Sequence, residues 1–218
     1  MINVAKNCKQ PAWLAVLECL HFTTEQALEW LDFFCFELNP VKCNDLFALT
    51  QSPIERIFLL GFWALLGGQS GIHKTEDSLN YKLVFRRSDD SEEFALIPQF
   101  KVKASNVSYR LDFLLCCRKK DGSLRCLAIE VDGHEFHERT REQVETSNAR
   151  NLVLLKLGIP SIHFSGSQII KGSVRCCSES AAACSQLTAC QDGTVAHNFA
   201  MYAFAGDTNK PEPNEVTE

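Results

Sequence analysis

Two apolar stretches joined by a short polar turn place the strongest constraint on how this chain folds. Residues 109–117 and 124–132 each read as a β-strand, and Lys119-Lys120-Asp121-Gly122-Ser123 between them is typical of a hairpin turn. Each strand carries an acid inside its apolar stretch, Asp112 in the first and Glu130 in the second. An ionised carboxylate removed from water costs several kcal/mol unless a cation or hydrogen-bond donors compensate it. The hairpin therefore predicts a site at which two acids are compensated.

The register of this hairpin decides whether the two acids can meet, because a slip of one residue moves a side chain to the other face. A two-residue turn would place Asp112 and Glu130 on opposite faces of the sheet. A three-residue loop with Gly122 in the left-handed conformation pairs Lys119 with Ser123 and sets Asp112 opposite Glu130. That register also gives an opposite face that is large and apolar throughout: Leu111, Phe113, Leu115, Leu127, Ile129 and Val131. We therefore expect Asp112 and Glu130 to be cross-strand neighbours.

The flanking segments predict an α/β fold in which helices cover a mixed sheet. Ser52-Pro53 begins an apolar helix that runs to about residue 66, since a capping Ser followed by Pro is a strong helix start. The further predicted elements are strands at 81–85, 94–102 and 160–164 and helices at 142–157 and 167–187. We expect a core of the order αβββαβ with about four strands. The predicted organisation is an N-terminal helical extension over 1–50, a core over 51–187, and a C-terminal segment over 188–218 that is frayed from about 206.

Composition excludes several classes of protein. The chain has 218 residues, of which 45% are hydrophobic and 22% charged, and this is the balance of a globular domain rather than a disordered chain. The longest apolar run, residues 57–66, is half of the roughly 20 residues that a membrane span needs. The number of Cys, 11, is odd, and several lie in apolar runs, which favours reduced thiols. We expect a cytoplasmic protein with no membrane association.

The acid pair has two interpretations that the pattern alone leaves open. Mg²⁺ binds a few carboxylate oxygens and keeps its other positions for water and phosphate, so Asp112 and Glu130 could hold this ion. Alternatively, the acids pair with Lys101, Lys103 or Arg110 in a purely structural network. Four cysteines, Cys176, Cys177, Cys184 and Cys190, lack the Cys-x2-Cys spacing of ordinary zinc sites and are interpreted as buried thiols.

Other polar residues near the acids are weaker candidates. Glu55 lies in the first turn of its helix, where the helix dipole alone explains an acid. His134 and His137 follow Asp132 without the zinc-protease pattern, and they are either polar surface or groups that bind phosphate or transfer a proton. Five basic residues, Lys101, Lys103, Arg110, Arg139 and Arg150, are either solvated surface or the lining of a groove for a phosphate backbone. The net charge of −5 argues against a protein that coats DNA without regard to sequence.

The order of these residues resembles the PD-(D/E)XK nuclease superfamily, and more closely the branch around very short patch repair endonucleases. The likeness covers about residues 52–187. It includes a helix acid, Glu55, then Asp112-Phe113 and Glu130-Val131-Asp132-Gly133 on two strands, with His134 and His137 beyond. Further matches are Gln99, Arg150, Leu154, Gly158, the strand to Phe164 and the segment Ser165-Gly166-Ser167-Gln168-Ile169. Asp132 stands where the superfamily has a Lys, as is usual in this branch.

This resemblance implies a metal-dependent endonuclease that hydrolyses DNA phosphodiester bonds. Asp112, Glu130 and the Val131 carbonyl would hold Mg²⁺, for which Mn²⁺ can substitute. Asp132 would orient the attacking water or bind a second ion, and Glu55 would reach the site through a water.

The resemblance also gives roles to residues around the metal. His134 or His137 would contact the phosphate or protonate the leaving oxygen, while Lys103 and Arg150 would hold the DNA backbone. Two alternatives remain: an inactive module of the same fold that binds nucleic acid or assembles with other proteins, and an interaction domain with structural acids. The helices over 1–50 are candidates for binding a second copy of the chain or a protein partner.

Overall fold

The computed structural model describes residues 48, 50–65, 70–74, 81–86, 91–104, 107–132 and 141–205. The predicted N-terminal helices and the predicted frayed end lie outside these residues, apart from residues 48 and 50. The helices are α4 (Pro53–Leu65), α5 (Arg141–Lys156), α6 (Gly166–Gln186) and α7 (Val195–Phe204). The strands are β1 (Ser70–Lys74), β2 (Tyr81–Arg86), β3 (Glu92–Pro98), β4 (Lys101–Ala104), β5 (Val107–Arg110), β6 (Phe113–Lys119), β7 (Leu124–Asp132) and β8 (Ser161–Ser165).

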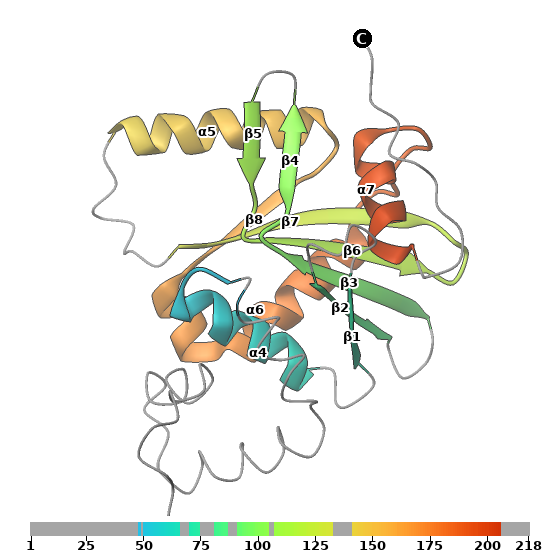
Figure 1. The fold of residues 1–218 in the computed structure, drawn as a ribbon, viewed down its shortest axis with the longest axis horizontal. Helices are drawn as coiled ribbons and strands as arrows, with labels where there is room; N and C mark the ends of the chain where they lie inside the picture. Colours follow the sequence, from blue (N-terminus) through green and yellow to red (C-terminus); the bar gives the residue numbers. More distant parts are fainter. Residues whose placement is uncertain are drawn as a thin grey trace, which may run out of the picture.

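The fold is α/β, as predicted, with a mixed sheet at its centre (Figure 1). Six strands lie in the order β1-β2-β3-β6-β7-β8. All neighbours are antiparallel except β7 and β8, which are parallel because α5 carries the chain back between them. The elements α4, β3, β6, β7, α5 and β8 reproduce the predicted αβββαβ order, and β1 and β2 extend the sheet beyond β3.

The β6–β7 hairpin has the predicted register. Cys116 pairs with Cys126, and Leu114 pairs with Ala128. The Lys119 amide donates to the Ser123 carbonyl at 3.0 Å. Gly122 has a φ of +81°, the left-handed conformation that the three-residue loop requires. Extending this register by one pair beyond β6 sets Asp112 opposite Glu130.

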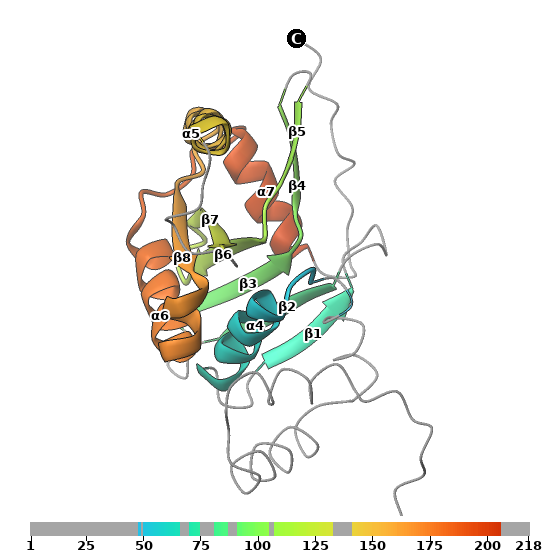
Figure 2. The same cartoon turned by 90° about the vertical axis from the view of Figure 1, so that its left-hand side faces the viewer.

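Helices cover both faces of the sheet, so there are two cores rather than one (Figure 2). Helices α4 and α6 cover one face, where aromatic side chains such as Phe58 and Phe113 pack with ring centroids 5.2 Å apart. Helix α7 covers the other face, together with Leu154 of α5. Leu111 was predicted on the same face as Phe113, and this was wrong: it belongs to the second core, because the chain turns between β5 and β6.

Two strands were predicted too long, and a ribbon replaces parts of both. Strand β3 ends at Pro98, and the chain then leaves the sheet at Gln99, whose φ is +53°. Strands β4 and β5 form a separate two-stranded ribbon that projects from the main sheet (Figures 1 and 2). Helix α7, which the sequence did not predict, begins at the N-cap Thr194 within the C-terminal segment. In the part of the chain that is described, no helix is both long and apolar enough to cross a membrane.

Candidate metal centre

Glu130 is a buried acid with one oxygen left unsatisfied. It lies near the end of β7 with 4% of its surface exposed. Its Oε2 is 3.2 Å from Arg150 Nη2 of α5, whereas its Oε1 is buried without a hydrogen-bond partner. Burial raises the pKa of Glu130 to about 8, and the neighbouring carboxylates of Asp112 and Glu55 add to the rise while Arg150 opposes it. A cation beside Oε1 would give this oxygen a partner and would stabilise the ionised form of Glu130.

Asp112 lies beside Glu130, at the bend that precedes β6. Its Oδ2 accepts a hydrogen bond of 2.8 Å from the amide of Val131, so the side chain reaches across to β7. Burial raises the pKa of Asp112, and the charge of Glu55 raises it further, while the Val131 amide, Arg150 and Arg110 lower it. The charge of Glu55 thus raises the pKa of both Asp112 and Glu130, and the charge of Asp112 also raises the pKa of Glu130; a group of acids with such raised pKa values is typical of a site that binds a cation.

Glu55 reaches this cluster from the first turn of α4, where it is 5% exposed. The Ser52 hydroxyl donates to Glu55 Oε1 at 2.9 Å and accepts from the Glu55 amide at 3.2 Å, a reciprocal cap of the helix start. The Gln51 amide donates to Oε2 at 2.9 Å. The carboxylate is thus fixed by its own helix start, which explains its place without reference to a metal. The Glu55 charge also raises the pKa of Asp112 and of Glu130, so this carboxylate lies near the acid pair.

Gln99 ties Glu55 to Asp112. Its Nε2 donates to Glu55 Oε2 at 2.7 Å, and its backbone amide donates to the Asp112 carbonyl at 2.8 Å. Its Oε1 is buried without a hydrogen-bond partner, like Oε1 of Glu130. Gln99 is one of the residues that resemble the nuclease superfamily, but no role was predicted for it. The bond that it makes depends on the turn after Pro98, which strand periodicity does not show.

The structure brings four of the predicted site residues into one cluster, with Arg150 ion-paired to it, and places three others on the neighbouring ribbon. Glu55, Asp112, Glu130 and Val131 form the cluster. Three basic residues lie exposed on the β4–β5 ribbon: Lys101, Lys103 and Arg110. Asp132 ends β7 and pairs with Ser165 of β8 through the backbone. Three predicted residues, His134, His137 and Arg139, lie outside the described residues, as does the side chain of Asp132.

Arg150, which was predicted to contact the DNA backbone, lies beside Glu130 in the structure. Its side chain is 23% exposed and is ion-paired with Glu130. The structural interpretation of the acids named Lys101, Lys103 or Arg110 as their partners, but the cation that pairs with Glu130 comes from α5 instead. Arg110 donates to the side chain of Gln51. Because α5 is a crossover helix, its alignment with β7 depends on packing that the sequence does not specify locally.

The donor set fits Mg²⁺ better than a soft metal. Asp112 and Glu130 offer hard carboxylate oxygens, one of them unsatisfied, and Mg²⁺ commonly takes one or two carboxylates while water and phosphate fill its other positions. Within the described ranges, no group of three or more His, Cys, Asp or Glu side chains is arranged to hold a metal ion. A site here would therefore consist of two carboxylates, completed by backbone, water or substrate oxygens.

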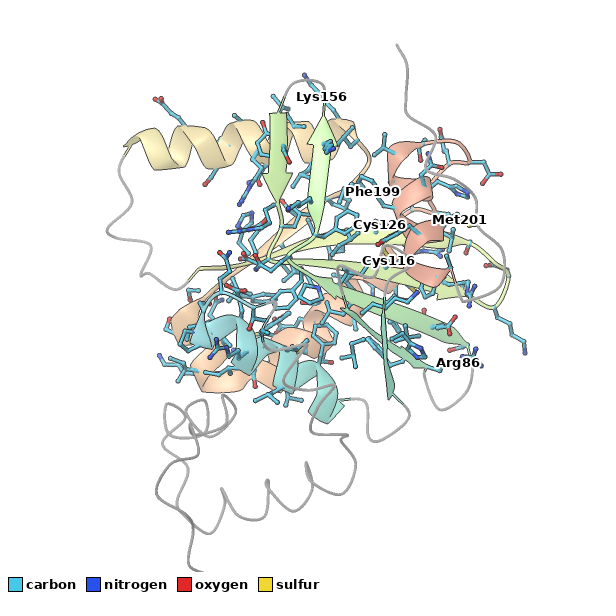
Figure 3. All side chains as sticks on the ribbon, in the orientation of Figure 1. Arg86, Cys116, Cys126, Lys156, Phe199 and Met201 are labelled. Atoms are coloured by element: carbon cyan, nitrogen blue, oxygen red, sulfur yellow. The ribbon has the colours of Figure 1, made fainter. Side chains whose placement is uncertain are left out.

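The cysteines of the described residues are free thiols and behave as core residues. Cys177 donates to the Phe58 carbonyl at 3.3 Å, and Cys184 donates to the Leu115 carbonyl at 3.5 Å. Cys116 and Cys126 face each other across β6 and β7 with their sulfur atoms 3.3 Å apart (Figure 3). Burial raises the pKa of the Cys184 thiol, which keeps it protonated and unreactive.

Comparison of the chain with protein families, with curated proteins and with solved structures finds no match. What the centre does is therefore inferred from its own residues.

Proposed function

We propose that this protein is a metal-dependent endonuclease that hydrolyses DNA phosphodiester bonds at the Asp112–Glu130 centre. The observation that carries the proposal is the buried Oε1 of Glu130, which has no hydrogen-bond partner and lies beside a second carboxylate. A buried carboxylate oxygen without a partner is costly, and a divalent cation is a partner well suited to two adjacent carboxylates. The resemblance of the motif order to PD-(D/E)XK nucleases supports the same chemistry.

Some residues of the centre would bind the ion, and others hold those ligands in place. Glu130 Oε1 and the second oxygen of Asp112, Oδ1, would hold Mg²⁺ with the Val131 carbonyl. The bound ion supplies a water of lowered pKa and neutralises charge on the phosphate. Arg150 holds Oε2 of Glu130 and the Val131 amide holds Oδ2 of Asp112, so Oε1 and Oδ1 are the oxygens that would bind the ion.

Residues around the ion would hydrogen-bond and orient water molecules and would protonate the leaving oxygen. Glu55, which is held by Ser52 and Gln99, would accept a hydrogen bond from a water in the site. Asp132 would orient the attacking water. His134 or His137 would give a proton to the leaving oxygen. These last two roles come from the resemblance.

Nicking of a supercoiled plasmid tests the proposal. Wild-type protein is expected to nick DNA in Mg²⁺ or Mn²⁺ and not in EDTA, while Glu130→Gln and Asp112→Asn lose at least about a hundredfold in rate, the typical scale for losing an essential charge in an active site. Glu93→Gln is the matched control, because Glu93 is an acid of the same sheet that pairs with Arg86 and Arg118 instead. Equal nicking by Glu130→Gln and Glu93→Gln would refute the proposal.

One observation favours a second candidate, an inactive module of the same fold that binds nucleic acid or assembles with other proteins. The ion pair between Glu130 and Arg150 already compensates one oxygen of the acid without any metal. Asp132 also stands in place of the superfamily Lys. Metal-independent DNA binding with no cleavage of any DNA structure would select this candidate. An absence of both would favour the interaction domain with structural acids.

A further inference from the structure

The β4–β5 ribbon has one apolar face and one basic face. Val102 is fully buried in the second core with Phe100, and Phe100 packs edge-on against Phe199 of α7 with ring centroids 5.0 Å apart. Alternate residues point the other way, where Lys101 pairs with Arg110 and Lys103 pairs with Ser108. All four of these outward residues are exposed. Each can donate hydrogen bonds and none is acidic, so the outward face suits an anion.

This row of cations begins at the acid cluster. Arg110 is two residues before Asp112, whose pKa it lowers, and it donates to the side chain of Gln51. Lys101 lies directly opposite Arg110, and Lys103 is two residues further along β4. At about 3.3 Å per residue along a strand, Lys101 and Lys103 are roughly 7 Å apart along β4, which is the length of about two base-pair steps of duplex DNA. A polyanion on the ribbon would therefore continue into the cluster.

We propose that the outward face of the β4–β5 ribbon, defined by Lys101, Lys103, Ser108 and Arg110, binds the phosphate backbone of double-stranded DNA beside the bond to be cut. This inference rests on the proposed function for the identity of the polyanion. The four outward residues include no aromatic side chain on which the bases of a single strand would stack. A two-stranded ribbon fits the major groove of B-form DNA, whereas the deep, narrow major groove of A-form RNA excludes it.

Binding of a fluorescent 20-base-pair duplex in EDTA tests this surface independently of cleavage. Each lost phosphate contact lowers the slope of log affinity against log salt by about 0.9. Lys101→Gln/Lys103→Gln is therefore expected to lower the slope by about 2 and to weaken binding roughly tenfold to a hundredfold at 0.1 M salt. The single variant Lys103→Gln should lower the slope by about 1.

The matched control is Lys120→Gln/Lys171→Gln, which removes two exposed lysines from the β6–β7 turn and from α6 and should bind as the wild type does. An unchanged slope in both ribbon variants would overturn the proposal, and so would wild-type protein that does not bind the duplex. Equal or tighter binding of a single strand or of duplex RNA would also overturn it.

Failure of this surface and failure of the nuclease can be told apart. Glu130→Gln is expected to abolish nicking while it leaves duplex binding in EDTA within about twofold of wild type. If the ribbon variants bind like wild type while Glu130→Gln has lost nicking, the ribbon assignment fails and the nuclease stands. If the ribbon variants lose binding while Glu130→Gln still nicks, the ribbon assignment stands and the metal centre fails.

Discussion

The two ends of the sheet each contain a buried glutamate, and only one of them has an unsatisfied oxygen. At the start of β3, Glu92 is 7% exposed and lies 3.4 Å from Lys119 Nζ, with the Ser185 hydroxyl donating to the same oxygen. Its neighbour Glu93 binds Arg86 through one oxygen and Arg118 through the other. Near the end of β7, Glu130 is as deeply buried but has one oxygen without a partner.

This difference separates a structural acid from a candidate ligand. Both glutamates are enclosed by the same sheet and both have a nearby cation, so neither burial nor an ion pair distinguishes them. The distinguishing feature is the second oxygen of Glu130, together with the two further acids that face it. A buried polar atom left unpaired is rare in folded proteins and calls for a specific explanation. A bound cation supplies that explanation at Glu130, whereas Glu92 needs none.

The largest stability effect expected from this comparison is in the pH dependence without metal. The pKa of Glu130 rises from 4.5 to about 8 on folding, so between these values the folded state keeps a proton that the unfolded state has released. The free energy of unfolding should therefore fall by about 1.4 kcal/mol per pH unit across this window. Urea unfolding at pH 5, 6, 7 and 8 in EDTA would measure it.

Substitution of Glu130 gives the control for this pH dependence. The Gln side chain of Glu130→Gln cannot ionise, so the free energy of unfolding of this variant should fall less steeply with pH than that of the wild type, by the equivalent of about one proton. If the free energy of unfolding changed equally with pH in wild type and in Glu130→Gln, then Glu130 would ionise normally in the folded protein. The proposed difference between the glutamates at the two ends of the sheet would then be wrong.

A smaller effect is expected from added metal. A ligand at a hundredfold excess over its Kd stabilises the native state by about 2.7 kcal/mol, which for a chain of this size raises Tm by roughly 5–10 °C. Because metal must displace the proton of Glu130, the rise in Tm with Mn²⁺ or Mg²⁺ should be larger at pH 8 than at pH 6. Differential scanning calorimetry should show the rise in wild type and Glu93→Gln and none in Asp112→Asn. A rise that survives Asp112→Asn would place the metal elsewhere.

The smallest effect on stability is expected at the start of β3, where both oxygens of Glu93 are ion-paired. Arg86→Met removes an ion-pair partner that is 61% exposed, and Glu93 keeps Arg118. Exposed ion pairs contribute about 0–1 kcal/mol, so the free energy of unfolding should fall by no more than about 1 kcal/mol. Urea unfolding at pH 7 measures this. A loss above about 2 kcal/mol would mean that the ion pairs of Glu93 contribute more to stability than exposed ion pairs normally do, which would contradict the contrast with Glu130.

The sequence predicted the hairpin that carries the acids, because only one register sets the two acids opposite each other and leaves large apolar residues on the other face. The left-handed Gly122 completed that prediction. The sequence did not predict the ribbon, because Phe100 and Val102 continue the strand alternation of β3 even though the chain has already turned at Gln99. The sequence also did not predict the Glu130–Arg150 ion pair, since this pair forms only when the crossover helix α5 packs beside β7.

An anomalous diffraction map of wild-type crystals soaked in Mn²⁺ would show whether Asp112 and Glu130 bind a metal ion. We predict a peak in contact with Oε1 of Glu130 and with the carboxylate of Asp112, while Arg150 remains on Oε2 of Glu130. The same soak of Asp112→Asn crystals should show no peak there. A wild-type map with no peak beside Glu130 at millimolar Mn²⁺, and with Arg150 still its ion-pair partner, would contradict the metal centre.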